Sequence, residues 1–264
     1  MEMKRVKAVI SYDGTRFAGY QIQPGMRTVQ SEIDKALVKM HKNKGIFSVA
    51  SGRTDSGVHA TGQVIHFDTP LTLPIDRWQM ALNVLLPTDI RIVEAEYTTE
   101  DFHARYSATG KTYVYKWSYS EVHSPFERNF SVHLGRSHPD IEAMRAAAEH
   151  LIGTHDFTSF CSSKTATSNK VRTVRQLTLE KQGDQLILTI EGNGFLYNMV
   201  RSIAGMLLVV GNGWKTPADV KQILESQSRK ANVKTAPAHG LYLENVSYED
   251  LGNFSWRSQE NHLT

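Results

Sequence analysis

The chain has 264 residues, 40% of them hydrophobic and 22% charged, a composition typical of a globular protein and unlike that of a disordered or fibrous one. Its single cysteine, Cys161, excludes an internal disulfide and any metal site built from paired cysteines. The net charge of +3 gives only a weak indication of an anionic partner.

In the first part of the chain, hydrophobic periodicity and turn residues predict strands alternating with helices. The predicted strands cover residues 5–12, 46–50, 63–68, 90–96 and 112–118. A first helix is expected over 28–42 because Thr28 can cap it, and a second over 74–83 because Pro74 suits a first helical turn. The polar, Gly-rich run 51–62 is expected to be a connection.

The second part of the chain repeats this mixture of elements. Helices are predicted over 139–151 and 196–210, with a short helix after Thr216-Pro217. Strands are predicted over 173–180 and 186–191, which flank a Gly183 hairpin, and over 241–248. Because the order lacks a regular βαβ rhythm, we expect an α+β fold with mainly antiparallel sheets. We place the boundary so that residues 1–106 and 107–264 form two halves.

Two features predict a cytoplasmic protein without a membrane span. The N-terminus leads directly into the first predicted strand, with no apolar segment like that of a signal peptide. The longest apolar stretch, 196–210, is shorter than the roughly 20 residues of a membrane helix and contains Arg201. An arginine in so apolar a helix needs a carboxylate partner.

Positive charge is concentrated in two segments. Residues 157–179 contain four cations and no acid: Lys164, Lys170, Arg172 and Arg175. Residues 102–120 contain Arg105, Lys111 and Lys116, again without an acid, and six aromatic residues are interleaved with them. Cations beside aromatic side chains are typical of a nucleic-acid-binding surface.

The densest group of polar residues is Gly52-Arg53-Thr54-Asp55-Ser56-Gly57-Val58-His59-Ala60-Thr61-Gly62-Gln63. Its simplest interpretation is a polar turn between two strands. A metal site formed by Asp55, His59, His66 and Asp68 is an alternative, but their mixed spacing does not favour it. The order of residues also differs from that of a phosphate-binding loop.

This run closely resembles the active-site motif of the tRNA pseudouridine synthase A family. Further blocks match the family in the same order along nearly the whole chain: Tyr12-Asp13-Gly14, Asp101-Phe102-His103-Ala104-Arg105, Lys111-Thr112-Tyr113-Val114-Tyr115, Asp156-Phe157-Thr158-Ser159-Phe160, Met199-Val200-Arg201 and Gly240-Leu241-Tyr242-Leu243. The resemblance implies two related α/β-sandwich halves joined across a central basic cleft.

The family converts uridine to pseudouridine at positions 38–40 in the anticodon arm of tRNA, without a cofactor or metal. By resemblance, Asp55 is the catalytic carboxylate and pairs with Arg201. Whether it attacks the sugar, attacks the base or takes a proton from the sugar is left open by the residues. Tyr113 matches the tyrosine that stacks on the uracil, and Leu243 is expected to supply an apolar wall of the same pocket.

Enzymes of this kind reach the glycosidic bond by flipping the nucleotide out of its stack. The resemblance links Arg53 and Arg105, with Phe102 and His103 beside them, to base flipping and RNA contact. Phosphate contacts are expected from Lys164, Lys170 and Arg172, although a solvated charged loop is the simpler interpretation of that segment. The resemblance also implies a homodimer that holds one tRNA across both subunits.

Two other functions compete with this hypothesis. The first is an RNA-binding module without catalysis, which would not need Asp55. The second is a hydrolase that excises a base or cleaves a glycoside. Such hydrolases usually need a second carboxylate; Asp13 and Asp68 are available, but no spacing supports either.

Overall fold

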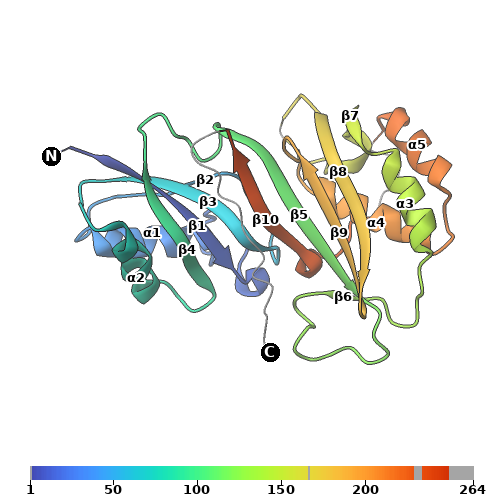
Figure 1. The fold of residues 1–264 in the computed structure, drawn as a ribbon, viewed down its shortest axis with the longest axis horizontal. Coiled ribbons are helices and arrows are strands. Elements are labelled where there is room, and N and C mark those ends of the chain that lie inside the picture. Colours follow the sequence, from blue (N-terminus) through green and yellow to red (C-terminus); the bar gives the residue numbers. More distant parts are fainter. Residues whose placement is uncertain (1, 166, 229–233, 250–264) are drawn as a thin grey trace, which may run out of the picture.

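The structure is a computed structural model that describes residues 2–165, 167–228 and 234–249, and one mixed sheet runs through them (Figure 1). Its ten strands are β1 (Lys4–Tyr12), β2 (Val49–Ala50), β3 (His59–Thr69), β4 (Ile90–Thr98), β5 (Ala108–Ser118), β6 (Val132–His133), β7 (Gly153–Asp156), β8 (Val171–Gln182), β9 (Gln185–Gly192) and β10 (Leu241–Tyr248). The main path is β4-β1-β3-β10-β5-β9-β8-β7, while β2 pairs with β3 and β6 pairs with β5.

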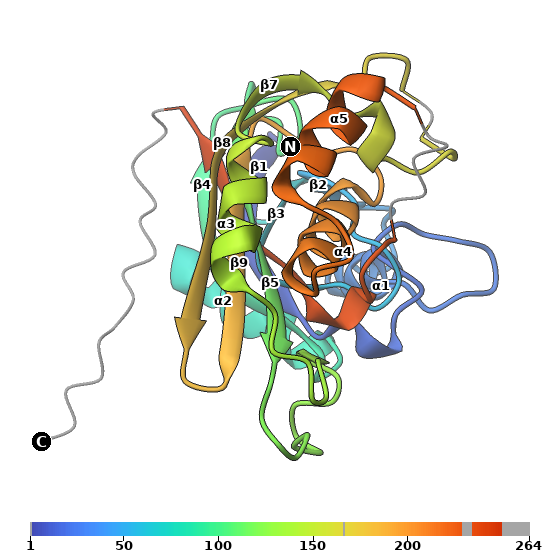
Figure 2. The same ribbon diagram turned by 90° about the vertical axis from the view of Figure 1, so that its right-hand side faces the viewer.

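Five α-helices in the described residues cover the sheet: α1 (Val29–Met40), α2 (Ile75–Leu85), α3 (Ile141–Glu149), α4 (Met199–Gly211) and α5 (Pro217–Ser226). Helices α1 and α2 pack together at the β4 end, and α3, α4 and α5 gather at the β8 end (Figure 1). Figure 2 shows α3, α4 and α5 together on one face of β8 and β9. None of the helices that the structure describes has the length and apolarity needed to cross a membrane.

The final strand, β10, joins the two parts of the sheet. It pairs in parallel with β3, where Tyr242 lies opposite His59, and antiparallel with β5, where Leu243 lies opposite Tyr113. Strand β3, which follows the loop that bears Asp55, and strand β5, which carries Tyr113, are therefore held at a fixed separation by β10. The division into residues 1–106 and 107–264 stays a prediction.

The α+β class with mainly antiparallel pairing is confirmed, since only the β3–β10 and β5–β6 pairings are parallel among the described strands. Local signals explain most of the element boundaries. The Thr28 side chain accepts a hydrogen bond from the amide of Ser31 and caps α1, and Thr216 caps α5 in the same way. Strand β9 alternates buried and half-buried residues along its whole length, as a half-buried strand should.

The predicted boundaries next to Asp55 and Arg201 were wrong, and one strand was not predicted. The connection predicted over 51–62 is shorter, because the backbone from His59 onwards already pairs in β3. Helix α4 begins at Met199 rather than at residue 196, because Asn198 takes a left-handed conformation with φ of 64° that interrupts the helix. Strand β7 was missed, because its glycine and three polar residues carry no alternation and owe their strand form to pairing with β8.

The close approach of β3 and β10 depends on Gly62. A Cβ atom at this position would lie 2.0 Å from the carbonyl oxygen of Glu244 on β10, which a real side chain cannot do. Glycine is therefore required by the backbone contact that joins the two parts of the sheet.

We expect Gly62→Ala to destabilise the protein by about 1–3 kcal/mol, because the β3–β10 pairing must shift to relieve the overlap. The free energy of unfolding from denaturant titration measures this effect. The matched control is Thr61→Ala, one residue earlier on the same strand, where the side chain is exposed. Equal stability of the two variants would show that the strands separate at no cost.

Candidate active site

The segment from Ser51 to Val58 carries Asp55 and is fixed at its start by a buried glutamine. Gln63, fully buried on β3, accepts a hydrogen bond from the Ser51 hydroxyl (2.6 Å) and donates one to the Gly52 carbonyl (2.9 Å). Further along, the Tyr20 amide donates to the Thr54 carbonyl (3.0 Å). These bonds satisfy the polar backbone of the loop and hold it in one conformation beside the sheet.

Asp55 forms an ion pair with Arg201 on α4, as the resemblance implied. Nη1 of Arg201 lies 3.0 Å from Oδ2 of Asp55, and the side chains are only 18% exposed for Arg201 and 19% exposed for Asp55. The guanidinium is itself held in place, because Nε donates to the Ala236 carbonyl (2.8 Å) and Nη1 also donates to Oδ1 of Asn198 (3.3 Å). Such multiple contacts orient the cation toward one carboxylate oxygen.

Burial and the ion pair act in opposite directions on Asp55. Burial raises the pKa of the Asp55 carboxyl above its usual value, while the hydrogen bond and charge of Arg201 lower it, with burial the larger effect. Arg201 therefore limits the rise and favours the ionised carboxylate. A partly buried carboxylate with a raised pKa and one specific charge partner is typical of a catalytic group.

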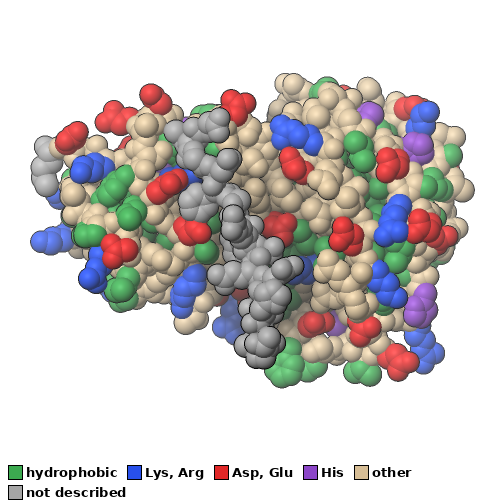
Figure 3. Space-filling model, in the orientation of Figure 1, with side chains coloured by type: hydrophobic (Ala, Val, Ile, Leu, Met, Phe, Trp, Pro, Cys, Tyr) green, Lys and Arg blue, Asp and Glu red, His purple; other side chains and the backbone are tan. Residues whose placement is uncertain are grey.

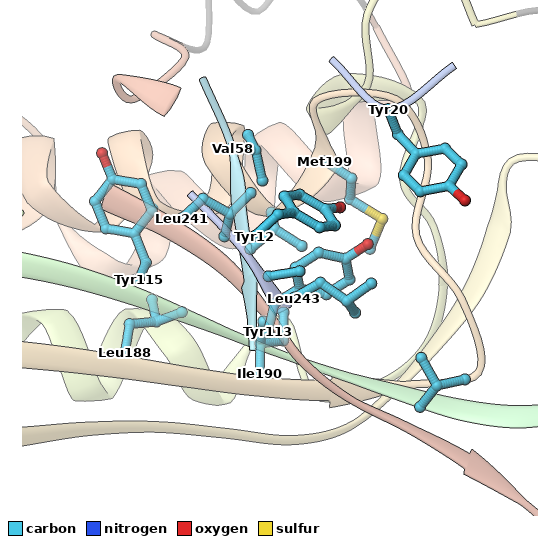
Figure 4. Packing of buried hydrophobic residues seen from close by; sticks show 14 of the residues in the cluster. Tyr12, Tyr20, Val58, Tyr113, Tyr115, Leu188, Ile190, Met199, Leu241 and Leu243 are labelled. Atoms are coloured by element: carbon cyan, nitrogen blue, oxygen red, sulfur yellow. The ribbon is translucent and has the colours of Figure 1, made fainter. Parts of the chain in front are cut away.

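Tyr113 lies on β5 and, like Asp55, lines a cleft in the surface of the protein. Its ring makes an edge-on contact with Phe195 at 5.2 Å between ring centroids. Burial, the main cause, raises the pKa of Tyr113 well above its usual range, with smaller contributions from Tyr12 and Asp55, so the phenol stays protonated at neutral pH. Figure 4 shows the hydroxyls of Tyr12 and Tyr113 pointing to the same side, toward Met199.

Leu243 takes a different place from the one expected. It is fully buried and lies opposite Tyr113 on the neighbouring strand, so it supports the tyrosine from the core rather than lining the cleft (Figure 4). Leu241, two residues earlier on β10, is the residue of this strand that lines the cleft.

The cleft around Asp55 has a volume of about 1390 Å³ and a strongly positive lining. Six cations line it: Arg53, Arg105, Lys111, Lys164, Arg172 and Arg201. Among the described residues of this lining, Asp55 is the only acid. The face of the molecule seen in Figure 3, in contrast, carries acidic and basic side chains interspersed. A basic cleft around one ion-paired carboxylate is typical of an enzyme that acts on nucleic acid.

The predicted RNA-contacting residues divide into two groups. Arg53, His103, Arg105, Lys164 and Arg172 all line the cleft. Phe102 does not contact it, because its side chain is buried against Tyr248, with 5.0 Å between the ring centroids. Lys170 is also buried, and its ammonium donates to the backbone carbonyls of Thr165 and Thr167. Phe102 and Lys170 therefore lie outside the cleft lining.

His103 organises the turn that presents Arg105. Its Nδ1 accepts hydrogen bonds from the backbone amides of Arg105 (3.1 Å) and Tyr106 (3.2 Å). Tyr106 stacks on the imidazole at 4.3 Å and lines the cleft with a side chain that is 78% exposed. Sequence reasoning missed Tyr106, although it belongs to the aromatic and basic segment 102–120 and is the kind of exposed ring on which a base can stack.

The four residues of the alternative metal site do not converge. Asp68 pairs with Arg5 at 2.7 Å, and the Nδ1 atoms of His59 and His66 accept backbone hydrogen bonds from Gly14 and Ala104. Within residues 2–165, 167–228 and 234–249, no group of three His, Cys, Asp or Glu side chains is arranged to hold a metal ion. Asp13 and Asp68, the possible second carboxylates of a hydrolase, both lie outside the lining of the cleft.

Comparisons with known proteins agree with this geometry. A family model described as tRNA pseudouridine synthase matches residues 8–107 and 147–249. The chain is 53% identical over 246 residues to tRNA pseudouridine synthase A of Lysinibacillus sphaericus, which covers 93% of this chain and 100% of that protein. It is 54% identical over 248 residues to the enzyme of the same name from Bacillus subtilis, with 93% and 100% coverage.

Among solved structures, a chain of a Cbf5-Nop10-Gar1 complex is similar at a TM-score of 0.34 and 12% identity, covering 77% of this chain and 54% of that one. The family match and the relatives at more than half identity establish the classification. The chain belongs to the tRNA pseudouridine synthase family, whose members are isomerases that act on tRNA.

We expect Arg201→Met to leave Asp55 buried without its cation, so that the pKa of the carboxyl rises further. If the reaction needs the ionised carboxylate, the fraction of active enzyme at neutral pH falls, and the acidic limb of the pH–rate profile moves to higher pH. Loss of the positioned cation should also slow pseudouridine formation by about 100-fold at neutral pH.

The measurement is pseudouridine formation in tRNA between pH 5 and 9. Arg175→Met is the matched control, since Arg175 forms a more exposed ion pair with Glu191 at 3.4 Å and does not line the cleft. An unchanged acidic limb in Arg201→Met would mean that Arg201 does not control the protonation of Asp55.

Proposed function

We propose that this protein isomerises uridine to pseudouridine at positions 38–40 in the anticodon arm of tRNA, with Asp55 as the catalytic carboxylate. The observation that carries this proposal is the position of Asp55: it is ion-paired with Arg201 and is the only acid in the described lining of a basic cleft. Membership of the tRNA pseudouridine synthase family supplies the reaction class.

The isomerisation breaks the bond between uracil N1 and sugar C1′ and forms a bond between C5 and C1′, while C5 loses its proton to solvent and N1 gains a proton. No atom is gained or lost, so the chemistry needs a nucleophile or base and a means of moving protons. Asp55 supplies the first in its ionised form, whether it attacks sugar or base or takes a sugar proton. Arg201 favours that form by its charge.

Tyr113 suits contact with the uracil ring. Its side chain lines the cleft, its hydroxyl has no hydrogen-bond partner among the described residues, and its raised pKa keeps the phenol neutral. A neutral phenol can stack beside a base; to take the C5 proton it would have to pass on its own hydroxyl proton in the same step. Stacking of this kind contributes about 1–3 kcal/mol per base, which offsets part of the cost of unstacking the nucleotide.

Arg53 and Arg105 are suited to stabilise the RNA from which the nucleotide has been flipped. Both line the cleft: Arg53 lies on the loop from Ser51 to Val58 that bears Asp55, here called the catalytic loop, and Arg105 lies on the segment before β5. A planar guanidinium can stack on a base and bind a phosphate at the same time. Lys164 and Arg172 extend the positive lining on the side of β8. We also propose a homodimer that holds one tRNA across both subunits and acts in the cytoplasm.

The proposal is tested with unmodified tRNA that carries tritium at uracil C5. Wild-type protein should release tritium and form pseudouridine in the anticodon arm, whereas Asp55→Asn should lose both signals by at least about 1000-fold while binding tRNA. The control is Asp101→Asn, an exposed acid outside the cleft lining. Release of free uracil would identify a hydrolase, and full activity of Asp55→Asn would reject Asp55 as the catalytic group.

Arg105→Ala tests the RNA contacts. We expect slower turnover and a shallower dependence of tRNA affinity on salt, because each lost phosphate contact reduces the slope of log K against log salt by about 0.7–0.9. The measurement is tRNA binding from 50 to 300 mM salt. Arg136→Ala, at a position outside the cleft lining, is the control. An unchanged slope in Arg105→Ala would remove Arg105 from the phosphate contacts.

A further inference from the structure

Lys111 is a cation in the cleft lining with no acidic partner among the described residues. Its ammonium donates one hydrogen bond, to the Ser51 carbonyl at 2.8 Å, and forms none of the ion pairs found in the described part of the chain. An ammonium has three donors. Two donors of Lys111 therefore have no protein partner in the described residues, although the side chain lines the cleft.

The surroundings of Lys111 offer no compensating negative charge. On the strands next to β5, the residues opposite Lys111 are Gly192 on β9 and Val246 on β10, neither of which is charged. The charged group that acts on it from the preceding segment is Arg105, another cation. The nearest part of the catalytic loop contributes the Ser51 carbonyl and Gly52, where an added Cβ would lie 2.5 Å from the ammonium nitrogen.

These surroundings disfavour the charged form of Lys111 in the free protein. Burial, with a smaller contribution from Arg105, lowers the pKa of the ammonium to about 8. An anion bound beside it would oppose both effects, because its charge stabilises the protonated ammonium. Lys111 also lies two residues before Tyr113 on β5, so both side chains project from the same face of the strand toward the cleft.

We propose that Lys111 binds a backbone phosphate of the tRNA next to the nucleotide held at Tyr113. The inference rests on the proposed function, since it takes the occupant of the cleft to be tRNA. A phosphodiester supplies the missing negative charge and acceptors for the two unused N–H groups. The bond to Ser51 fixes the ammonium in place, so that binding the phosphate orders no further side chain.

The test compares tRNA binding by wild-type protein and Lys111→Met at pH 7 and pH 9, over a range of salt concentrations. At pH 7 we expect Lys111→Met to bind about tenfold more weakly, with a salt slope shallower by about 0.7–0.9. The ratio of the two affinities should shrink toward pH 9, because wild-type protein then loses part of the Lys111 charge. The ratio cancels the titration of groups that both proteins share.

Lys116→Met is the matched control. It removes the same charge from the same strand, but Lys116 lies over the Tyr242 ring and outside the cleft lining, so it should leave the salt slope unchanged. Denaturant unfolding of each variant shows whether the fold is kept.

The inference is overturned if Lys111→Met keeps the wild-type affinity and salt slope and loses only kcat, which would make Lys111 a structural support of the catalytic loop. An affinity ratio that is equal at pH 7 and pH 9 would also overturn it. Failure of the proposed function looks different: wild-type protein itself would then form no pseudouridine, whatever Lys111→Met does to binding.

Discussion

The ion pair between Asp55 and Arg201 connects two residues that are 146 positions apart in the chain. One lies on a loop before β3 and the other on α4, which packs on the β8 side. A carboxylate placed this deeply would favour its protonated form, and only a fixed cation opposes that tendency. The ion pair determines where in the cleft an ionised carboxylate is available, and the other lining groups can act only relative to that position.

The geometry of the pair depends in turn on β10. This strand pairs with β3 on one side and with β5 on the other, so it sets the distance between the loop that bears Asp55 and the strand that bears Tyr113. The contact is tight enough that Gly62 passes the Glu244 carbonyl without room for a side chain. A rigid central sheet of this kind holds reacting groups in place better than mobile loops can.

Much of the fold was predictable from the sequence because local signals there are strong. Thr28 and Thr216 mark helix starts, and the alternation in β9 marks a half-buried strand. Local signals could not show that Asn198 interrupts α4, nor that a short polar segment becomes β7 through pairing alone. The pairing of Asp55 with Arg201 was predicted only from the resemblance to a family, because no spacing in a single sequence reveals a contact between residues 146 positions apart.

The sequence alone also cannot predict which individual cations face the cleft. A count of charges along the chain treats Lys170 and Lys111 alike, yet Lys170 lies outside the cleft lining and its ammonium donates to backbone carbonyls, while Lys111 keeps two donors at the cleft. Burying one cation next to another, as with Lys111 near Arg105, costs free energy in the protein without RNA. A lining of six cations around one acid is therefore a surface that is destabilised when empty and stabilised by a polyanion, so the same charges that weaken the isolated fold strengthen its hold on RNA.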